Sequence, residues 1–375
     1  MEKIYTSLGL MSGTSMDGVD ASIIRSNGED KYESVLDEYF EYDEEIYKDL
    51  VSLRGKINSA KDIILNLKLI NEVERKITLF HGKISNKIIQ ESSIEIDLIG
   101  FHGQTIFHDA KQKVSKQLGD GPLLSNILKK DVVYNFRAND IFNGGQGAPL
   151  AAIFHNLLVN NIKIQLPACI LNIGGIANIT IITSKKNDDL KSYDVGPGNC
   201  LLDEWVRKHT NKRYDKNGET ASIGKTNKII LNQAIDNFDN VKVGSNLSFD
   251  IKDFDLSFVK GLSYEDGLST LADFTSVIIY QSIIKAIKIN QNKRLNILVC
   301  GGGRKNLSLI NNIKKKLPDN INLDLIDNYN IDGDFIESQA FAYLAIRSIL
   351  KKMISFPKTT NVIKSCTGGI LVKNY

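Results

Sequence analysis

The stretch LGLMSGTSMDGVDA, at residues 8–21, places a glycine-punctuated turn between two apolar runs. A second stretch, ILNIGGIANITII at residues 170–182, has the same layout. Glycine adopts positive φ without a Cβ clash, so turns of this kind can direct several backbone N–H groups toward one anion. Two such hairpins, one in each half of the chain, predict two loops that bind one polyphosphate.

The size and composition are those of a soluble globular protein with two domains. At 375 residues, the chain exceeds the usual size of a single hydrophobic core. Apolar residues make up 42% and charged residues 24%, and the net charge is only +3. Lysines are scattered among acids and form no basic stripe, so we expect no nucleic-acid partner.

Neither a signal peptide nor a membrane helix is expected. The N-terminal MEKIYTSLGLMSG has only a short apolar run, and no segment approaches the roughly 18 uncharged apolar residues of a membrane span. The four cysteines are far apart and show no CxxC spacing, as expected of buried thiols in a reducing compartment. These features predict a cytoplasmic protein without a disulfide framework or a zinc site.

The spacing of apolar residues predicts an α/β chain with two similar halves. The first half is predicted to begin with an antiparallel meander of three strands, at residues 4–10, 19–24 and 32–40. A long helix, a buried strand and further alternating elements follow at 60–90, 96–100, 121–130, 132–134 and 148–159. The second half has hairpin strands at 169–173 and 178–182 and a buried strand at 296–300, with helices at 201–209, 268–289 and 334–353.

The glycine turns do not form the commonest phosphate-binding loop, because none is followed by Gly-Lys-Ser/Thr. Phosphate would instead be bound by backbone N–H groups and by the hydroxyls of Ser12, Thr14 and Ser15. One such hairpin alone is more typical of an ordinary tight turn, whereas the pair with a third glycine cluster at residues 301–303 favours a nucleotide. This third cluster either offers a flat surface to an adenine ring or permits a close strand-to-helix crossing.

Three aspartates are placed where they could act on a polyphosphate or on water. Asp17 and Asp20 could hold Mg²⁺ through water, although an Asx-type turn explains Asp17 equally well. Asp194 ends a predicted strand before the rigid corner at residues 196–198, where a carboxylate can face a cleft and take a proton from a nucleophile. On position alone, Asp194 could equally be a hydrogen-bond acceptor that stabilises the turn.

A second polar group has the planar hydrogen-bonding side chains that bind sugars: His102, Gln104, Arg137 and Asp140. Glu337, near the start of the last helix, either faces a cleft or favours the helix dipole. Three further histidines are interpreted as structural residues: His81, His155 and His209.

Taken together, these stretches resemble the anhydro-N-acetylmuramic acid kinase family. The matching segments follow the family's order across essentially the whole chain: GLMSGTSMDGVDA, GFHGQTIFH, LGDGPLL, NFRANDIFNGGQGAPL, LNIGGIANIT, DVGPGNCLLDEW, CGGGRKN and FIESQAFAYLA. The resemblance implies the fold of the acetate and sugar kinase, chaperone ATPase and actin superfamily, in which two ribonuclease-H-like lobes have ATP between them. It also implies an ATP-dependent reaction of cell-wall recycling, in which the 1,6-anhydro bond is hydrolysed and O6 is phosphorylated.

The resemblance implies residue roles as well. Asp194 matches the aspartate that activates water for attack at C1, and Glu337 matches an acidic residue at the sugar. Together with the glycine clusters, residues 13–20 of the first loop complete the predicted ATP site: Gly13, Thr14, Ser15, Met16, Asp17, Gly18, Val19, Asp20, Gly174, Gly175, Asn178, Gly301, Gly302, Gly303 and Asn306. The predicted lobes are residues 1–133 with 340–375, and residues 134–339.

The chain departs from the family's pattern at two places. Val195 stands where the family has threonine beside the catalytic aspartate, and residues 246–259 replace a stretch of lysine, serine, threonine, glycine and arginine. Two alternative functions remain open: a kinase of a different amino sugar, and a non-catalytic, actin-like nucleotide-binding protein. The predicted partners are the amino sugar and ATP with Mg²⁺, with no nucleic acid and no membrane; a homodimer is allowed.

Overall fold

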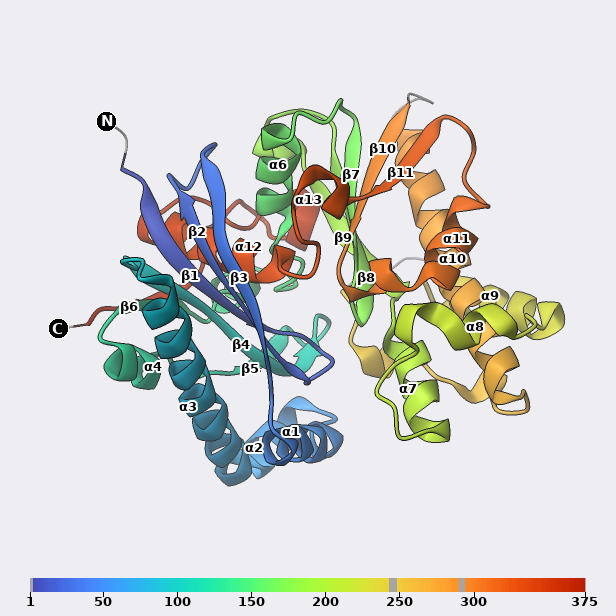
Figure 1. The fold of residues 1–375 in the computed structure, drawn as a ribbon, viewed down its shortest axis with the longest axis horizontal. Helices are drawn as coiled ribbons and strands as arrows, with labels where there is room; N and C mark the ends of the chain where they lie inside the picture. The colour runs from blue at the N-terminus through green and yellow to red at the C-terminus, as the bar shows by residue number, and fades with distance from the viewer. Residues whose placement is uncertain (1–2, 243–247, 290–293, 375) are drawn as a thin grey trace. The chain divides into compact units, whose positions relative to one another are not determined.

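The computed structural model describes residues 3–242, 248–289 and 294–374. Its contacts divide the chain into two compact units (Figure 1). Unit 1 comprises Met1–Lys163, Lys185–Leu190 and Asp334–Tyr375, and unit 2 comprises Ile164–Ser184 and Lys191–Gly333. The sequence analysis placed its boundaries after residue 133 and before residue 340, whereas residues 134–163 and 334–339 make their contacts within unit 1.

Unit 1 is built on a mixed sheet of seven strands. Its main path follows the order β12-β6-β4-β1-β2-β3, and β5 pairs with β4. The strands β1, β2 and β3 form the predicted antiparallel meander, while β4 runs parallel to β1 and β6 runs parallel to β4. The strand bounds are β1 Tyr5–Ser12, β2 Gly18–Ser26, β3 Tyr32–Glu41, β4 Leu98–Asp109, β5 Val114–Leu118, β6 Asp131–Tyr134 and β12 Ile370–Val372.

Unit 2 repeats the same plan in a sheet of five strands. The order β11-β10-β7-β8-β9 has an antiparallel meander, β7 to β9, followed by two parallel strands. This is the order and direction of β6-β4-β1-β2-β3 in unit 1, so the chain is a duplicated ribonuclease-H-like α/β fold, as predicted. The strand bounds are β7 Ala168–Ile173, β8 Ile176–Ile182, β9 Lys191–Pro197, β10 Leu295–Cys300 and β11 Ile321–Leu325.

Helices cover these sheets. In unit 1 they are α1 Glu44–Lys56, α2 Ala60–Leu65, α3 Leu67–Ser92, α4 Gly121–Leu128, α5 Ala138–Phe142, α6 Ala152–Asn161, α12 Ile336–Ile349 and α13 Pro357–Thr360. In unit 2 they are α7 Cys200–His209, α8 Glu219–Ile223, α9 Lys228–Lys242, α10 Tyr264–Ile289 and α11 Leu307–Lys314. The helix predicted over 60–90 is divided at Asn66, whose ψ of 18° and side-chain bond to the Asp62 carbonyl end the first segment.

The last long helix packs directly on the unit 1 sheet. A Cβ atom on Gly9 would lie 1.9 Å from the Ser338 carbonyl oxygen, and one on Gly100 would lie 2.2 Å from that of Phe341. Glycine in β1 and β4 therefore lets the backbone of α12 approach closely. This packing fixes the helix whose first turn holds Glu337.

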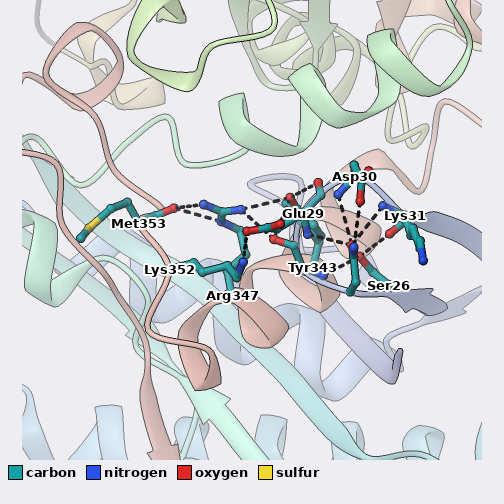
Figure 2. Close-up of polar contacts among 10 residues, drawn as sticks. Ser26, Glu29, Asp30, Lys31, Tyr343, Arg347, Lys352 and Met353 are labelled. Carbon is teal, nitrogen blue, oxygen red and sulfur yellow. Dashed lines mark hydrogen bonds and ion pairs between the residues drawn. The ribbon is translucent and has the colours of Figure 1, made fainter. Parts of the chain in front are cut away.

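The C-terminal end of α12 is also tied to the turn between β2 and β3 (Figure 2). The Arg347 guanidinium donates to the carbonyls of Gly28 and Met353, and the Tyr343 hydroxyl donates to the Glu29 carbonyl at 2.9 Å. The Asn27 side chain accepts the N–H groups of the same turn. These bonds join the turn between β2 and β3 to the last long helix within unit 1.

Among the described residues, one helix is long and apolar enough to cross a membrane by length and composition alone. Residues Tyr264–Ala286 of α10 have a mean hydropathy of 1.2, and 72% of this apolar stretch is buried inside the structure. The helix packs against α7, α8, α9, α11 and β9. Its apolar character is therefore that of the core helix of unit 2.

Candidate functional site

The first predicted phosphate loop joins β1 to β2 in unit 1. The Met16 N–H donates to the Gly13 carbonyl at 3.2 Å, and Met16 has a φ of 59°. Within the part of the chain that the structure describes, no acceptor binds the N–H groups of Thr14 and Ser15. The loop thus has the donor set that a phosphate requires.

The two carboxylates at this loop, Asp17 and Asp20, lie in different surroundings. Asp17 is half-buried and accepts the Ser15 hydroxyl, so the turn-forming explanation of Asp17 has direct support. Asp20 lies in β2, between Met11 and Tyr39 in the sheet. Across residues 3–242, 248–289 and 294–374, no group of three His, Cys, Asp or Glu side chains could hold a metal ion by itself.

Gln104 connects the predicted sugar residues to this loop. It pairs with Ser12 across the parallel strands β1 and β4, and its Nε2 donates to the Gly13 carbonyl at 2.8 Å. The side chain is fully buried, and its Oε1 has no partner among the residues described. An unsatisfied buried acceptor is costly, so this oxygen is suited to a hydroxyl donor at the loop.

His102, Arg137 and Glu337 form a charged cluster in unit 1. His102 Nδ1 donates to the Gly103 carbonyl at 2.8 Å, which leaves Nε2 as the acceptor for Arg137 Nη2 at 2.9 Å. Burial, with the Arg137 charge as a lesser cause, holds the pKa of His102 well below its usual value. Burial raises the pKa of Glu337, and the charge of Arg137 partly opposes this rise. The Arg137 guanidinium therefore binds a neutral imidazole and interacts electrostatically with the Glu337 carboxyl.

Asp140, also predicted to bind sugar, is buried inside unit 1. Its carboxylate accepts the Gly147 N–H at 2.6 Å and the Thr360 hydroxyl. Arg137 donates to the carbonyl of the same Gly147 at 2.6 Å. The bonds that the structure gives Asp140 therefore stabilise the loop that holds Arg137.

The second hairpin of the sequence lies beside the Gly-Pro-Gly corner in unit 2. The carbonyls of Gly174 and Gly175 accept N–H groups from Gly198, Asn199 and Cys200 at 2.8–3.1 Å. A Cβ on Gly198 would lie 2.2 Å from the Gly174 carbonyl oxygen. The sheet therefore brings together two glycine motifs that are more than twenty residues apart.

The third glycine cluster follows β10 beside the same hairpin. Gly301 has a φ of 78°, and Cβ atoms on Gly301 and Gly303 would lie 2.2 Å from Asn172 Oδ1 and 2.3 Å from Ile173 Cγ2. Gly302 is exposed and has no atom within 4 Å of its Cβ position. The close strand-to-helix crossing has support from Gly301 and Gly303, which permit close packing. The flat surface for an adenine ring has support from Gly302, which leaves an open surface. Asn306 is buried, and its Oδ1 accepts the Leu309 N–H as the N-cap of α11.

Asp194 lies in the middle of β9, although the sequence analysis placed it at a strand end. It pairs with Asn178 of β8, next to a register shift, and its Oδ2 accepts the Phe249 N–H at 2.9 Å. Phe249 belongs to the unusual segment 246–259, of which residues 246 and 247 lie outside the described residues. The sequence analysis missed this donor, because a backbone N–H leaves no signal in residue type.

Val195 packs in the apolar core of unit 2 and is fully buried. Val195 is the extra residue at the register shift between β8 and β9, because Gly196 pairs with Ala177 and Asp194 pairs with Asn178. The missing threonine hydroxyl would have belonged to the core side.

Sequence comparisons match the chain to one family over essentially its whole length. The family model described as anhydro-N-acetylmuramic acid kinase matches residues 5–374. The chain is 70% identical to the anhydro-N-acetylmuramic acid kinase of Pelagibacter ubique (strain HTCC1062), over 100% of both chains. It is 36% identical to that of Zymomonas mobilis subsp. mobilis, over 96% of this chain and 98% of the relative. Among solved structures, the activator of the 2-hydroxyisocaproyl-CoA dehydratase from Clostridium difficile with bound ADPNP matches with a TM-score of 0.44 and 12% identity, over 91% of this chain and 94% of that one.

Proposed function

Because the chain belongs to the anhydro-N-acetylmuramic acid kinase family, we propose that it uses ATP to convert 1,6-anhydro-N-acetylmuramic acid to N-acetylmuramic acid 6-phosphate. The protein is a kinase. Its reaction combines hydrolysis of the 1,6-anhydro bond with phosphorylation of O6, as a step of peptidoglycan recycling in the cytoplasm. Units 1 and 2 would be the two lobes of the enzyme.

The nucleotide assignment rests on the first loop. Its N–H groups at Thr14 and Ser15 have no acceptor among the described residues and would bind phosphate oxygens. In unit 2, residues 174–178 would form the second loop, and Gly302 would provide the surface for adenine. Asp17 and Asp20 would hold Mg²⁺ through water, and this ion, when bound, neutralises charge on the phosphates.

The sugar assignment rests on the His102, Arg137 and Glu337 cluster, with the buried Oε1 of Gln104 as a further acceptor. Guanidinium groups bind hydroxyl and carboxylate oxygens, and the lactyl carboxylate of a muramic acid fits the positive charge of Arg137, which His102 holds through its Nε2. Asp140 would position Arg137 through their common partner, Gly147.

Asp194 would be the general base. A carboxylate that takes a proton from water allows the water to attack C1 opposite the departing O6, following the logic of an inverting glycosidase. The Phe249 N–H holds Oδ2 of this carboxylate at 2.9 Å.

Isotope labelling tests the proposal. The protein is incubated with ATP, Mg²⁺ and the anhydro sugar in ¹⁸O-labelled water, and the product is analysed by mass spectrometry. We expect one label at C1 and none in the transferred phosphate. Phosphorylation of N-acetylglucosamine in preference to the anhydro sugar would instead indicate the alternative amino-sugar kinase, and ATP binding without turnover would indicate a non-catalytic protein.

A further inference from the structure

Three buried polar side chains meet beneath the first loop of unit 1. Ser12 is the last residue of β1, and its Oγ lies 2.8 Å from the Tyr42 hydroxyl and 3.3 Å from Nε2 of His81, a residue of α3. All three side chains are at most 2% exposed. Phe80 and Phe101 pack against the rings of Tyr42 and His81, so water is excluded from the cluster.

The direction of each hydrogen bond follows from chemistry. His81 Nδ1 lies 2.8 Å from the Ile77 carbonyl, which can only accept, so Nδ1 carries the proton. Burial lowers the pKa of His81 to about 4, so the ring is neutral at pH 7 and its Nε2 accepts. The Ser12 hydroxyl therefore donates to His81, and Tyr42 donates to Ser12.

This chain of bonds makes the Ser12 hydroxyl unavailable to a phosphate, contrary to the sequence prediction. The Ser12 hydroxyl donates its proton to His81, and Ser12 as a whole residue is only 1% exposed. Ser12 is instead the fixed end of the strand from which the loop begins.

Tyr42 also binds the other end of the loop. Its backbone N–H donates to the Asp17 carbonyl at 2.9 Å, while its hydroxyl holds Ser12. One residue thus fixes the backbone on both sides of residues 13–16. Gln104 adds a third bond, to the Gly13 carbonyl.

We propose that Tyr42 and His81 are positioning residues of the first phosphate loop. Tyr42 forms hydrogen bonds at both ends of the loop, and His81 orients the Ser12 hydroxyl, to which Tyr42 donates. This inference rests on the proposed function of the loop. A pre-organised loop loses less conformational freedom on binding, so the two residues act on nucleotide affinity without touching the nucleotide.

The test uses Tyr42→Phe, which removes only the hydroxyl, with titration calorimetry of Mg²⁺-ATP on the full chain. We expect the Kd for ATP and the KM for ATP to rise about tenfold, as for loss of one buried hydrogen bond, with the KM for the sugar unchanged. Tyr32→Phe is the control, because it removes a half-buried tyrosine's hydroxyl, which donates to Gln339 elsewhere in unit 1. An unchanged Kd for ATP, with equal losses of thermal stability in both variants, would make Tyr42 merely structural and overturn the proposal.

A double-mutant cycle with Ser12→Ala separates this role from direct phosphate contact. If Tyr42 acts through Ser12, the double variant binds ATP no more weakly than either single variant. If Ser12→Ala alone weakens ATP binding and Tyr42→Phe does not, Ser12 contacts phosphate and the proposal fails. Absence of sugar phosphorylation by the unmodified protein would refute the proposed function, yet the ATP titrations would still decide the role of Tyr42.

Discussion

The backbone N–H of Phe249 lies 2.9 Å from Oδ2 of Asp194, so a residue 55 positions later in the chain holds the proposed base. One oxygen of the carboxylate is fixed by this bond. We predict that Asp194→Asn, which keeps an acceptor for Phe249 but removes the basic oxygen, lowers sugar phosphorylation by about 10²–10⁴-fold. The affinity for ATP, measured by calorimetry, should stay within about twofold. Glu204→Gln, on helix α7 of the same unit, is the control, and normal turnover by Asp194→Asn would remove Asp194 from the mechanism.

A second prediction concerns the donor itself. Proline at position 249 has no N–H, so Phe249→Pro removes the hydrogen bond that Oδ2 of Asp194 accepts. We expect kcat to fall about tenfold, the effect of one charge-assisted hydrogen bond. Phe249→Leu keeps the N–H and removes only the ring that contacts Phe254, so its kcat should be close to normal. Equal losses of kcat in the two variants, with both folded by circular dichroism, would assign the effect to ring packing.

Arg137 gives a third prediction, on the sugar side. Arg137→Gln removes the charge beside His102 and Glu337 and leaves the His102 Nε2 without its donor. We expect the KM for the anhydro sugar to rise about tenfold or more, since a hydrogen bond to a charged group is worth roughly 1.5–3 kcal/mol. The KM for ATP should not change. Arg25→Gln, which breaks an exposed ion pair on the same sheet, should alter neither constant, and a rise in the KM for ATP alone would contradict the assignment.

The sequence predicted the two glycine hairpins of the site but not the hydrogen bonds between residues far apart in the chain. Glycine turns between apolar runs revealed both hairpins, since local residue types decide such turns. The contact from Phe249 to Asp194 and the cluster around Ser12 join residues far apart in the chain. A lone buried histidine such as His81 has no pattern that distinguishes it from a core residue. Helix α10 was predicted from its apolar spacing, and its high hydropathy reflects burial on most sides.

Stability in acid provides a fourth prediction. Burial lowers the pKa of His155 to about 3, against about 6.5 in the unfolded chain. Between these values the unfolded chain binds a proton that the folded chain excludes, so the free energy of unfolding falls as the pH drops, by up to about 1.4 kcal/mol per pH unit. Above about pH 6.5 neither state binds this proton, so His155 no longer lowers the free energy of unfolding. We therefore expect the melting temperature to fall less between pH 7 and pH 4.5 in His155→Leu than in the unmodified protein. Identical pH profiles for the two proteins would contradict this origin of acid sensitivity.

The last prediction separates the two explanations of the glycine cluster at residues 301–303. Gly303→Ala would place a Cβ 2.3 Å from Ile173 Cγ2, so we expect a loss of about 1–3 kcal/mol in stability from overpacking. Gly302 has open space at its Cβ position, so Gly302→Leu should keep its melting temperature and cover the surface proposed for adenine. We expect the KM for ATP to rise about tenfold in Gly302→Leu, because the side chain displaces the ring from its apolar contact. Gly261→Leu is the matched control, since Gly261 also lies exposed in unit 2 with no atom within 4 Å of its Cβ position. If Gly302→Leu and Gly261→Leu bind ATP equally well, the cluster serves only the close crossing from β10 to α11, and adenine must lie elsewhere.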